Sequence, residues 1–215
     1  MNSIHPLSLL IILSNVLITY KGFKDDRFFE RYKFNVAAVQ RGQWDRIITA
    51  GFLHVDYSHL LFNMFTFYFF GDIVIYRLGV LGFLAVYFIS LLAGNLFSYI
   101  YYKRNLLYSA VGASGAVTGT LYAAIVLYPE MRLGIMFIPI PLPAYLVGLG
   151  YMLYTLYGIK KANDNIGHAA HFAGAIAGLA IAILFYPLSI FNDPIAIVAL
   201  LIPLVLFVLM ERKKI

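Results

Sequence analysis

Residues 167–186, GHAAHFAGAIAGLAIAILFY, form one long apolar run. A helix that crosses a bilayer needs about 20 mostly apolar residues, and this run supplies them. At about 100° per residue, His171, Gly174 and Gly178 share one helix face. Glycines on one face let a second backbone approach closely. The run therefore predicts a membrane helix with a histidine at the top of a packing groove.

The composition of the 215-residue chain indicates a membrane protein. Hydrophobic residues make up 62% and charged residues 12%, against about 45–50% and about 25% in soluble domains. The net charge of +6 comes from residues between apolar runs, so it indicates interfacial anchors and no nucleic-acid partner. The absence of cysteine excludes disulfides and thiolate metal sites.

Seven apolar runs are candidate membrane helices. They are Ile4–Tyr20, Leu60–Leu78, Val80–Tyr102, Ser114–Tyr128, Ile138–Tyr157, His168–Tyr186 and Ile195–Met210. The first run has no basic segment before it and no clear cleavage site after it, so we interpret it as a retained helix. We expect an all-α polytopic membrane protein with one membrane domain over residues 1–215, a core at 60–186 and an extra helix at 195–210.

The segment 21–58 mixes charged and aromatic residues and includes Trp44. Because Trp and Arg favour the headgroup level of a bilayer, we expect this first loop to lie in the membrane interface. A solvated loop is the alternative.

The helix that begins at Ser114 is short for a membrane span. From Ser114 to Tyr128 it extends about 22 Å, whereas the hydrocarbon core is about 30 Å thick. The chain before Ser114 is therefore expected to dip into the membrane, where irregular backbone needs protein or water around it. We predict a water-filled cavity above Ser114.

Three polar clusters within the apolar runs are candidate functional sites, because polar groups are costly in a membrane. In the first, Ser114 lies between small residues at a helix N-terminus, where unpaired N–H groups suit a developing oxyanion. The alternative is a serine within a small-residue helix contact that includes Gly115 and Gly119.

His171 and the pair His59 and Asn63 form the other two clusters. Packed against the face of Ser114, the His171 imidazole is a candidate base for that weak nucleophile. His59 and Asn63 share a helix face and both can donate hydrogen bonds to an oxyanion. The alternatives are a histidine that satisfies a carbonyl and a polar pair that ties helices together.

A metal site is the rival chemistry. Two groups of possible metal ligands lie close together in sequence. The first is His54, Asp56 and His59, and the second is Asp164, His168 and His171. The His-Glu-x-x-His motif of zinc proteases is absent from the sequence, which disfavours this alternative.

Three motifs in this order resemble the rhomboid family of intramembrane serine proteases, over about residues 42–186. They are His-x-x-x-Asn at 59–63, Gly-x-Ser-Gly at 112–115 and Ala-His-x-x-Gly-x-x-x-Gly at 170–178. The resemblance implies a six-helix core, and the run at 195–210 resembles the additional C-terminal helix of one subgroup.

The resemblance also implies roles for the residues of these motifs. Ser114 is the implied nucleophile and His171 its base and acid. The Ser114 N–H, His59 and Asn63 form the implied oxyanion site, which Gly112 supports. Gly115, Gly174 and Gly178 are the implied helix-packing residues.

The sequence departs from the family pattern at three places. Thr118 stands where many relatives have an aromatic residue that braces the histidine, and Ile75 stands where many have a glutamate. In the family's Trp-Arg pair of the first loop, Arg46 matches, while Asp45 holds the tryptophan position and Trp44 stands one place earlier.

The implied activity is hydrolysis of peptide bonds in or near transmembrane segments of single-span membrane proteins, without metal or cofactor. We expect a multi-pass protein of the cell membrane, with the lipid bilayer as its surroundings. Orientation is open, because most of the 16 lysines and arginines lie on the side where the site opens. The positive-inside rule makes that side cytoplasmic, whereas well-known family members open to the outside.

Two other functions remain alternatives. A non-catalytic relative that binds transmembrane helices is favoured by the departures at Thr118 and Ile75. A small transporter also places polar residues in the membrane, but the seven runs have no evident inverted repeat.

Overall fold

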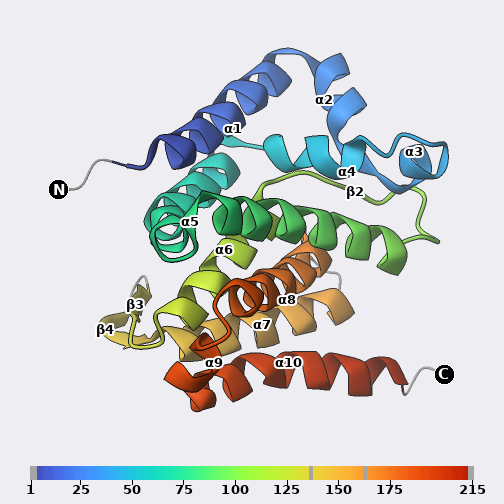
Figure 1. The fold of residues 1–215 in the computed structure, drawn as a ribbon. Coiled ribbons are helices and arrows are strands. Elements are labelled where there is room, and N and C mark those ends of the chain that lie inside the picture. Colours follow the sequence, from blue (N-terminus) through green and yellow to red (C-terminus); the bar gives the residue numbers. More distant parts are fainter. Residues whose placement is uncertain (1–3, 136–137, 162–163, 213–215) are drawn as a thin grey trace.

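The computed structural model describes residues 4–135, 138–161 and 164–212, which form a helical bundle with two small two-stranded sheets (Figure 1). The helices are α1 (Pro6–Lys24), α2 (Asp26–Tyr32), α3 (Val36–Gln40), α4 (Arg46–Thr49), the 3-10 helix η1 (Ala50–Phe52), α5 (Tyr57–Tyr101), α6 (Ser114–Leu127), α7 (Ala144–Lys161), α8 (His168–Phe185), α9 (Ser189–Asn192) and α10 (Pro194–Arg212). The strands are β1 (Phe34–Asn35), β2 (Ser109–Ala110), β3 (Arg132–Ile135) and β4 (Ile138–Pro143). The prediction of an all-helical polytopic membrane protein is confirmed.

Four of the described helices are long and apolar enough to cross a membrane, namely α1, α5, α8 and α10, and α6 is a shorter apolar helix. The two predicted runs Leu60–Leu78 and Val80–Tyr102 form the two arms of α5. The arms meet at Gly79, whose φ of 70° lies in the left-handed region that favours glycine.

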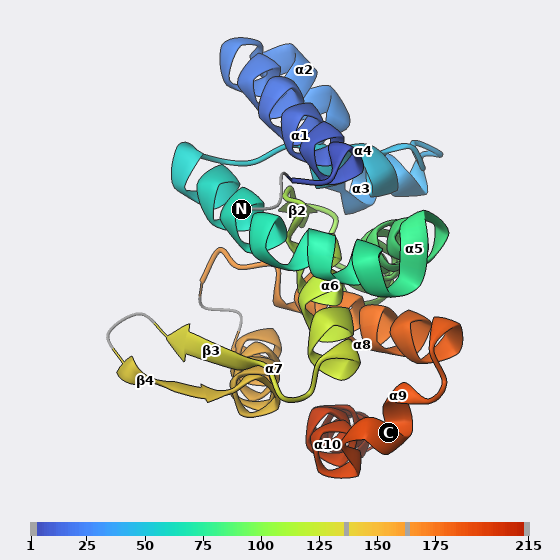
Figure 2. The same cartoon turned by 60° about the vertical axis from the view of Figure 1, so that its left-hand side comes forward.

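The predicted helix Ile138–Tyr157 is wrong in its first residues. Ile138–Pro143 forms strand β4, which pairs with β3 in an antiparallel hairpin that projects from the bundle (Figure 2). Prolines alternate along this stretch, at 139, 141 and 143. Each removes a backbone N–H and disfavours helical geometry in the preceding residue, so helix α7 begins only at Ala144.

The first loop contains more structure than the sequence predicted. Helix α1 continues to Lys24, and α2, α3, α4 and η1 follow before α5. Arg46 holds this segment together from a buried position, because its guanidinium donates to Glu30 O, Lys33 O and Gln43 Oε1. Strand β1 pairs with β2 and so connects the loop to the chain just before Ser114.

Helix α6 lies at the centre of the bundle and is buried along almost its whole length (Figure 2). It packs mainly against α5 and α8, and α5 also packs against α8. These three helices carry all three sequence motifs, so the fold gathers segments that are far apart in the chain.

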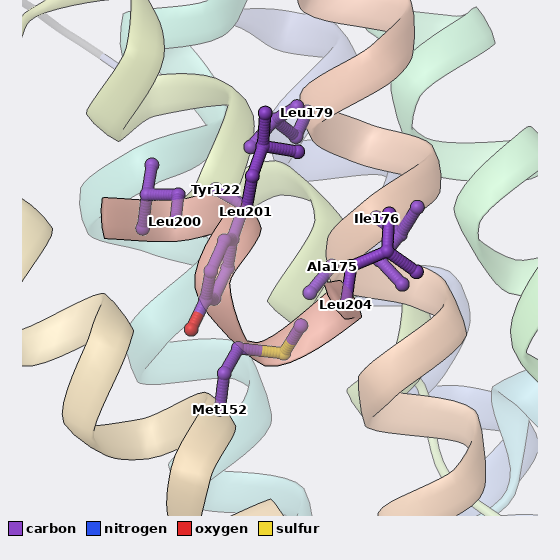
Figure 3. Close-up of a pocket in the computed structure, with 8 residues that line it drawn as sticks. All are labelled: Tyr122, Met152, Ala175, Ile176, Leu179, Leu200, Leu201 and Leu204. Atoms are coloured by element: carbon purple, nitrogen blue, oxygen red, sulfur yellow. The ribbon is translucent and has the colours of Figure 1, made fainter. Parts of the chain in front are cut away.

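Helix α10 covers the outer side of α7, and the two make extensive contact (Figure 1). Figure 3 shows the apolar side chains at this junction, among them Met152 of α7, Leu179 of α8 and Leu200 of α10. The pocket that they line has a volume of about 10 Å³, which is about the space of one water molecule. It is therefore a packing gap, too small for a substrate.

Candidate active site

Ser114 is the first residue of α6, and the N-cap residue Ala113 makes no capping hydrogen bond with its side chain. The first N–H groups of a helix have no partner within the helix. The positive end of the helix dipole lies at the same place. The half-buried Ser114 hydroxyl therefore lies beside backbone donors that suit an oxyanion.

The turn before Ser114 depends on Gly112, whose φ of 132° few residues other than glycine adopt. Its N–H donates to Ala50 O at 2.9 Å. A Cβ atom at Gly112 would lie 2.8 Å from His59 Nε2 and 3.6 Å from Ser114 Oγ. The imidazole of His59 and the Ser114 hydroxyl thus border the same small space, which glycine leaves open.

His59 and Asn63 lie in the first turns of α5. Asp56 caps this helix by accepting the His59 N–H at 2.7 Å. Asn63 is buried, and its Nδ2 donates to His59 O at 2.9 Å. An amide group has two N–H donors, so this bond leaves a second one. In the described part of the chain, no hydrogen bond joins Asn63 to Ser114.

Helices α6 and α8 meet through their backbones. A Cβ atom at Gly174 would strike Gly115 O, and one at Gly178 would strike Gly119 O. Gly115 itself lies against Ala170 O, 3.3 Å from the position of a Cβ. Because Ser114 precedes Gly115 and His171 follows Ala170, this contact brings the backbone segments that carry the serine and the histidine together.

His171 is buried near the beginning of α8. Its Nδ1 forms a hydrogen bond of 2.8 Å with the Tyr151 hydroxyl. The two rings are stacked, with centroids 6.1 Å apart and planes inclined by 26°. Among the described residues, no hydrogen bond joins His171 to Ser114. In unliganded enzymes such bonds are often long and tighten with substrate.

Tyr151 was missed by sequence reasoning. It is one of 17 tyrosines and belongs to no motif. The only signal in the sequence is indirect. Thr118 stands where many relatives have an aromatic residue that braces the histidine. From α7, the Tyr151 side chain occupies the place beside the imidazole.

The sequence indicates His54 only as a candidate metal ligand, but the structure places it in support of the Ser114 turn. It is fully buried, and its Nε2 accepts the Ala113 N–H at 3.4 Å. Its Nδ1 lies 2.9 Å from Thr19 Oγ1, which donates its own proton to Phe52 O. Nδ1 is therefore the donor of this pair. Burial lowers the pKa of His54 to about 3, so the ring is neutral.

The residues of the rival metal sites have other partners. His168 Nε2 lies 3.0 Å from Asp164 Oδ2, and this hydrogen bond lowers the pKa of Asp164. His54 and His59 meet edge to face, with ring centroids 4.9 Å apart. In the described ranges, no three His, Asp or Glu side chains gather as a possible metal-binding group.

Ile75, which stands where many relatives have a glutamate, is buried in an apolar cluster of α5 and α6 side chains. At this position the Ile75 side chain is therefore part of the hydrophobic core.

The fold and these contacts define a polytopic helical membrane protein whose helices α6 and α8, which carry Ser114 and His171, pack closely through glycines. A family model described as the Rhomboid domain matches residues 41–188. The chain belongs to the rhomboid family.

Several relatives support this assignment. The chain is similar to RHOMBOID-like protein 12, mitochondrial, of Arabidopsis thaliana, with 28% identity over 79% of this chain and 54% of that protein. It is similar to Rhomboid protein 1, mitochondrial, of Saccharomyces cerevisiae, with 28% identity over 81% of this chain and 52% of that protein. It also resembles YdcA of Bacillus subtilis, a candidate rhomboid protease by name, with 33% identity over 68% of this chain and 69% of that protein. The chain spans about half the length of the two mitochondrial relatives.

Proposed function

We propose that this chain is an intramembrane serine peptidase, with Ser114 as the nucleophile and His171 as its general base and acid. The observation that carries the proposal is the backbone contact between α6 and α8. Gly115 lies against Ala170, and Gly174 and Gly178 lie against Gly115 and Gly119. This packing supports a pair in which the proposed base acts on the proposed nucleophile inside an apolar bundle.

The proposed reaction has two halves. Ser114 Oγ attacks the carbonyl carbon of the substrate while His171 Nε2 takes the hydroxyl proton. The C–N bond then breaks, and His171 gives the proton to the leaving amine. In the second half, water attacks the acyl group and gives a proton to His171, which returns it to Ser114 Oγ.

The oxyanion of each tetrahedral intermediate is assigned to the Ser114 N–H, His59 and Asn63. Among these groups His59 has the most direct geometric support, because its ring borders the space beside Gly112 and Ser114 Oγ. Such donors stabilise charge that develops only in the transition state, and one of them is typically worth about 10²–10³ in kcat. The water-filled cavity above Ser114 stays a prediction.

The proposed substrates are single-span membrane proteins whose helices unwind readily near the cut. Gly or Ser in that region lowers helix stability. The proposed location is the cell membrane. Because two relatives are mitochondrial by name, recovery of the protein with mitochondria in cell fractionation would overturn this location.

The test is cleavage of a single-span reporter protein in liposomes. We expect the wild type to cut and Ser114→Ala and His171→Ala to be inactive. Ser14→Ala is the matched control, since the Ser14 hydroxyl donates locally to Leu10 O within α1, and it should cut like the wild type. Continued cleavage by Ser114→Ala would overturn the proposal.

A helix-binding function without catalysis is the second candidate, favoured by the small residue Thr118 beside the histidine. A fluorophosphonate probe separates the two functions in intact membranes. Covalent labelling that is lost in Ser114→Ala supports the peptidase, whereas an unlabelled wild type supports the binder.

A further inference from the structure

We propose that Tyr151 is a positioning residue that fixes the tautomer of His171 and keeps Nε2 unprotonated toward Ser114. This inference deepens the proposed function and rests on it for its catalytic meaning. The contact itself is a property of the fold, because Tyr151 reaches His171 from a different helix, α7.

A histidine that accepts a proton from serine must present a bare nitrogen to it. Neutral imidazole carries one proton, so a bare Nε2 requires the proton on Nδ1. In this chain Nδ1 faces the Tyr151 hydroxyl at 2.8 Å. The direction of this one hydrogen bond therefore decides whether His171 can act as the base.

The surroundings of Tyr151 offer its proton a second acceptor. A phenol has one proton to donate and can also accept. The hydroxyls of Thr118 and Thr155 lie near the Tyr151 hydroxyl. Thr155 Oγ1 is buried and has no hydrogen-bond partner among the described residues. A buried oxygen without a partner costs stability, so a tyrosine proton directed at Thr155 would satisfy it.

With its proton directed at the threonines, the Tyr151 oxygen accepts the Nδ1–H of His171. The proposed role of His171 as the base requires this direction. In the opposite direction Tyr151 donates to Nδ1, and the imidazole proton lies on Nε2, where it would face Ser114. The stacked rings hold the imidazole plane in the same orientation.

Contacts with α6 and α10 hold helix α7 in place near Tyr151. The Tyr122 hydroxyl of α6 donates to Gly148 O, about one turn before Tyr151. Leu200 of α10 also packs against Gly148, with its Cδ2 3.0 Å from the position of a Cβ. These contacts help to fix the position of Tyr151 along α7 relative to His171.

The decisive experiment observes the imidazole nitrogens directly and needs no substrate. Full-length protein with ¹⁵N-labelled histidine is placed in liposomes at neutral pH, and the His171 signals are assigned by comparison with His171→Ala. We expect wild-type His171 to carry its proton on Nδ1. We expect Tyr151→Phe, which keeps the ring and loses the hydroxyl, to populate the Nε2–H tautomer.

Two controls make this result specific. Tyr157→Phe is the same substitution on the same helix at an exposed side chain, and it should leave the His171 signals unchanged. Thr155→Val removes the hydroxyl proposed to accept the tyrosine proton and should shift the tautomers in the same direction as Tyr151→Phe. A wild type with the proton on Nε2, or unchanged signals in Tyr151→Phe, overturns the proposal.

Cleavage kinetics supply the second readout. We expect Tyr151→Phe to lower kcat about tenfold or more with KM unchanged, since the hydroxyl acts through the base and does not touch substrate. A raised KM with unchanged kcat would contradict this role. If the wild type cuts no reporter, the proposed function fails while the tautomer measurement still decides the role of Tyr151.

Discussion

His171 is held by two contacts that differ in kind. Its own helix α8 meets α6 backbone to backbone, with Gly174 and Gly178 against the carbonyls of Gly115 and Gly119. Helix α7 reaches the same histidine through the long side chain of Tyr151. The first contact sets how far the backbone at His171 lies from the backbone at Ser114, and the second sets how the imidazole ring is turned.

This difference predicts unequal tolerance to change. A backbone carbonyl cannot move without moving its helix, so an added atom between α6 and α8 must separate the helices. A side chain can adopt another rotamer, so changes around α7 are absorbed more easily. Substitutions at glycines in the two regions compare them directly.

The largest effect is expected for Gly178→Ala, which breaks the backbone contact. The new Cβ would strike Gly119 O, and such overpacking costs about 1–3 kcal/mol or more. We expect a loss of about 3 kcal/mol in unfolding free energy in detergent micelles, together with loss of reporter cleavage. An unchanged melting temperature would show that α6 and α8 do not depend on this contact.

The next effect concerns the turn before Ser114, which is held by hydrogen bonds. His54→Ala leaves the Ala113 N–H without its acceptor, and a buried donor without a partner costs about 1–3 kcal/mol. Thr19→Val removes the other end of the same chain of hydrogen bonds. Because the two residues act together, their double variant should lose less stability than the sum of the single variants. Simple additivity in thermal unfolding would contradict the network.

The same histidine predicts a pH dependence. Burial lowers the pKa of His54 from 6.5 to about 3, with His59 adding to this shift and Asp56 opposing it. Below pH 6.5 the unfolded state binds a proton that the folded state does not. The stability present above that pH is therefore lost as pH falls, by about 1.4 kcal/mol per pH unit.

Unfolding measured between pH 8 and pH 4 checks this sign. The wild type should be most stable above about pH 6.5. His54→Gln should show a shallower slope below that pH, because it carries no titratable group at this position. A slope that is identical in the two proteins would assign the acid sensitivity to other groups.

The sequence predicted the backbone contact well and the side-chain contact not at all. The face of His171, Gly174 and Gly178 follows from helix periodicity alone, and its partner had to be another small-residue face. The helical fold followed equally directly from the apolar runs. Tyr151 and His54 could not be found this way, because their roles depend on how α7 and the first loop pack on α6 and α8.

The start of α7 and the inside of the first loop were missed for a different reason. Hydropathy does not distinguish an apolar strand from an apolar helix, and the alternating prolines at 139, 141 and 143 carried the information instead. The short helices α2, α3 and α4 are stabilised by buried Arg46 and by pairing of β1 with β2. Those contacts join segments that no local pattern connects.

The smallest effect is expected for Gly150→Ala on α7, which completes the comparison with Gly178→Ala. A Cβ at Gly150 would meet no atom within 4 Å among the described residues. Alanine favours a helix over glycine by about 1 kcal/mol in water, so we expect stability to be unchanged or to rise by up to about 1 kcal/mol. For a chain of this size, that gain corresponds to a melting temperature about 2–4 °C higher. Cleavage should stay at the wild-type rate. A loss of stability as large as that of Gly178→Ala would mean that α7 is packed as rigidly as α8. The backbone contact and the side-chain contact of His171 would then not differ in their tolerance to change.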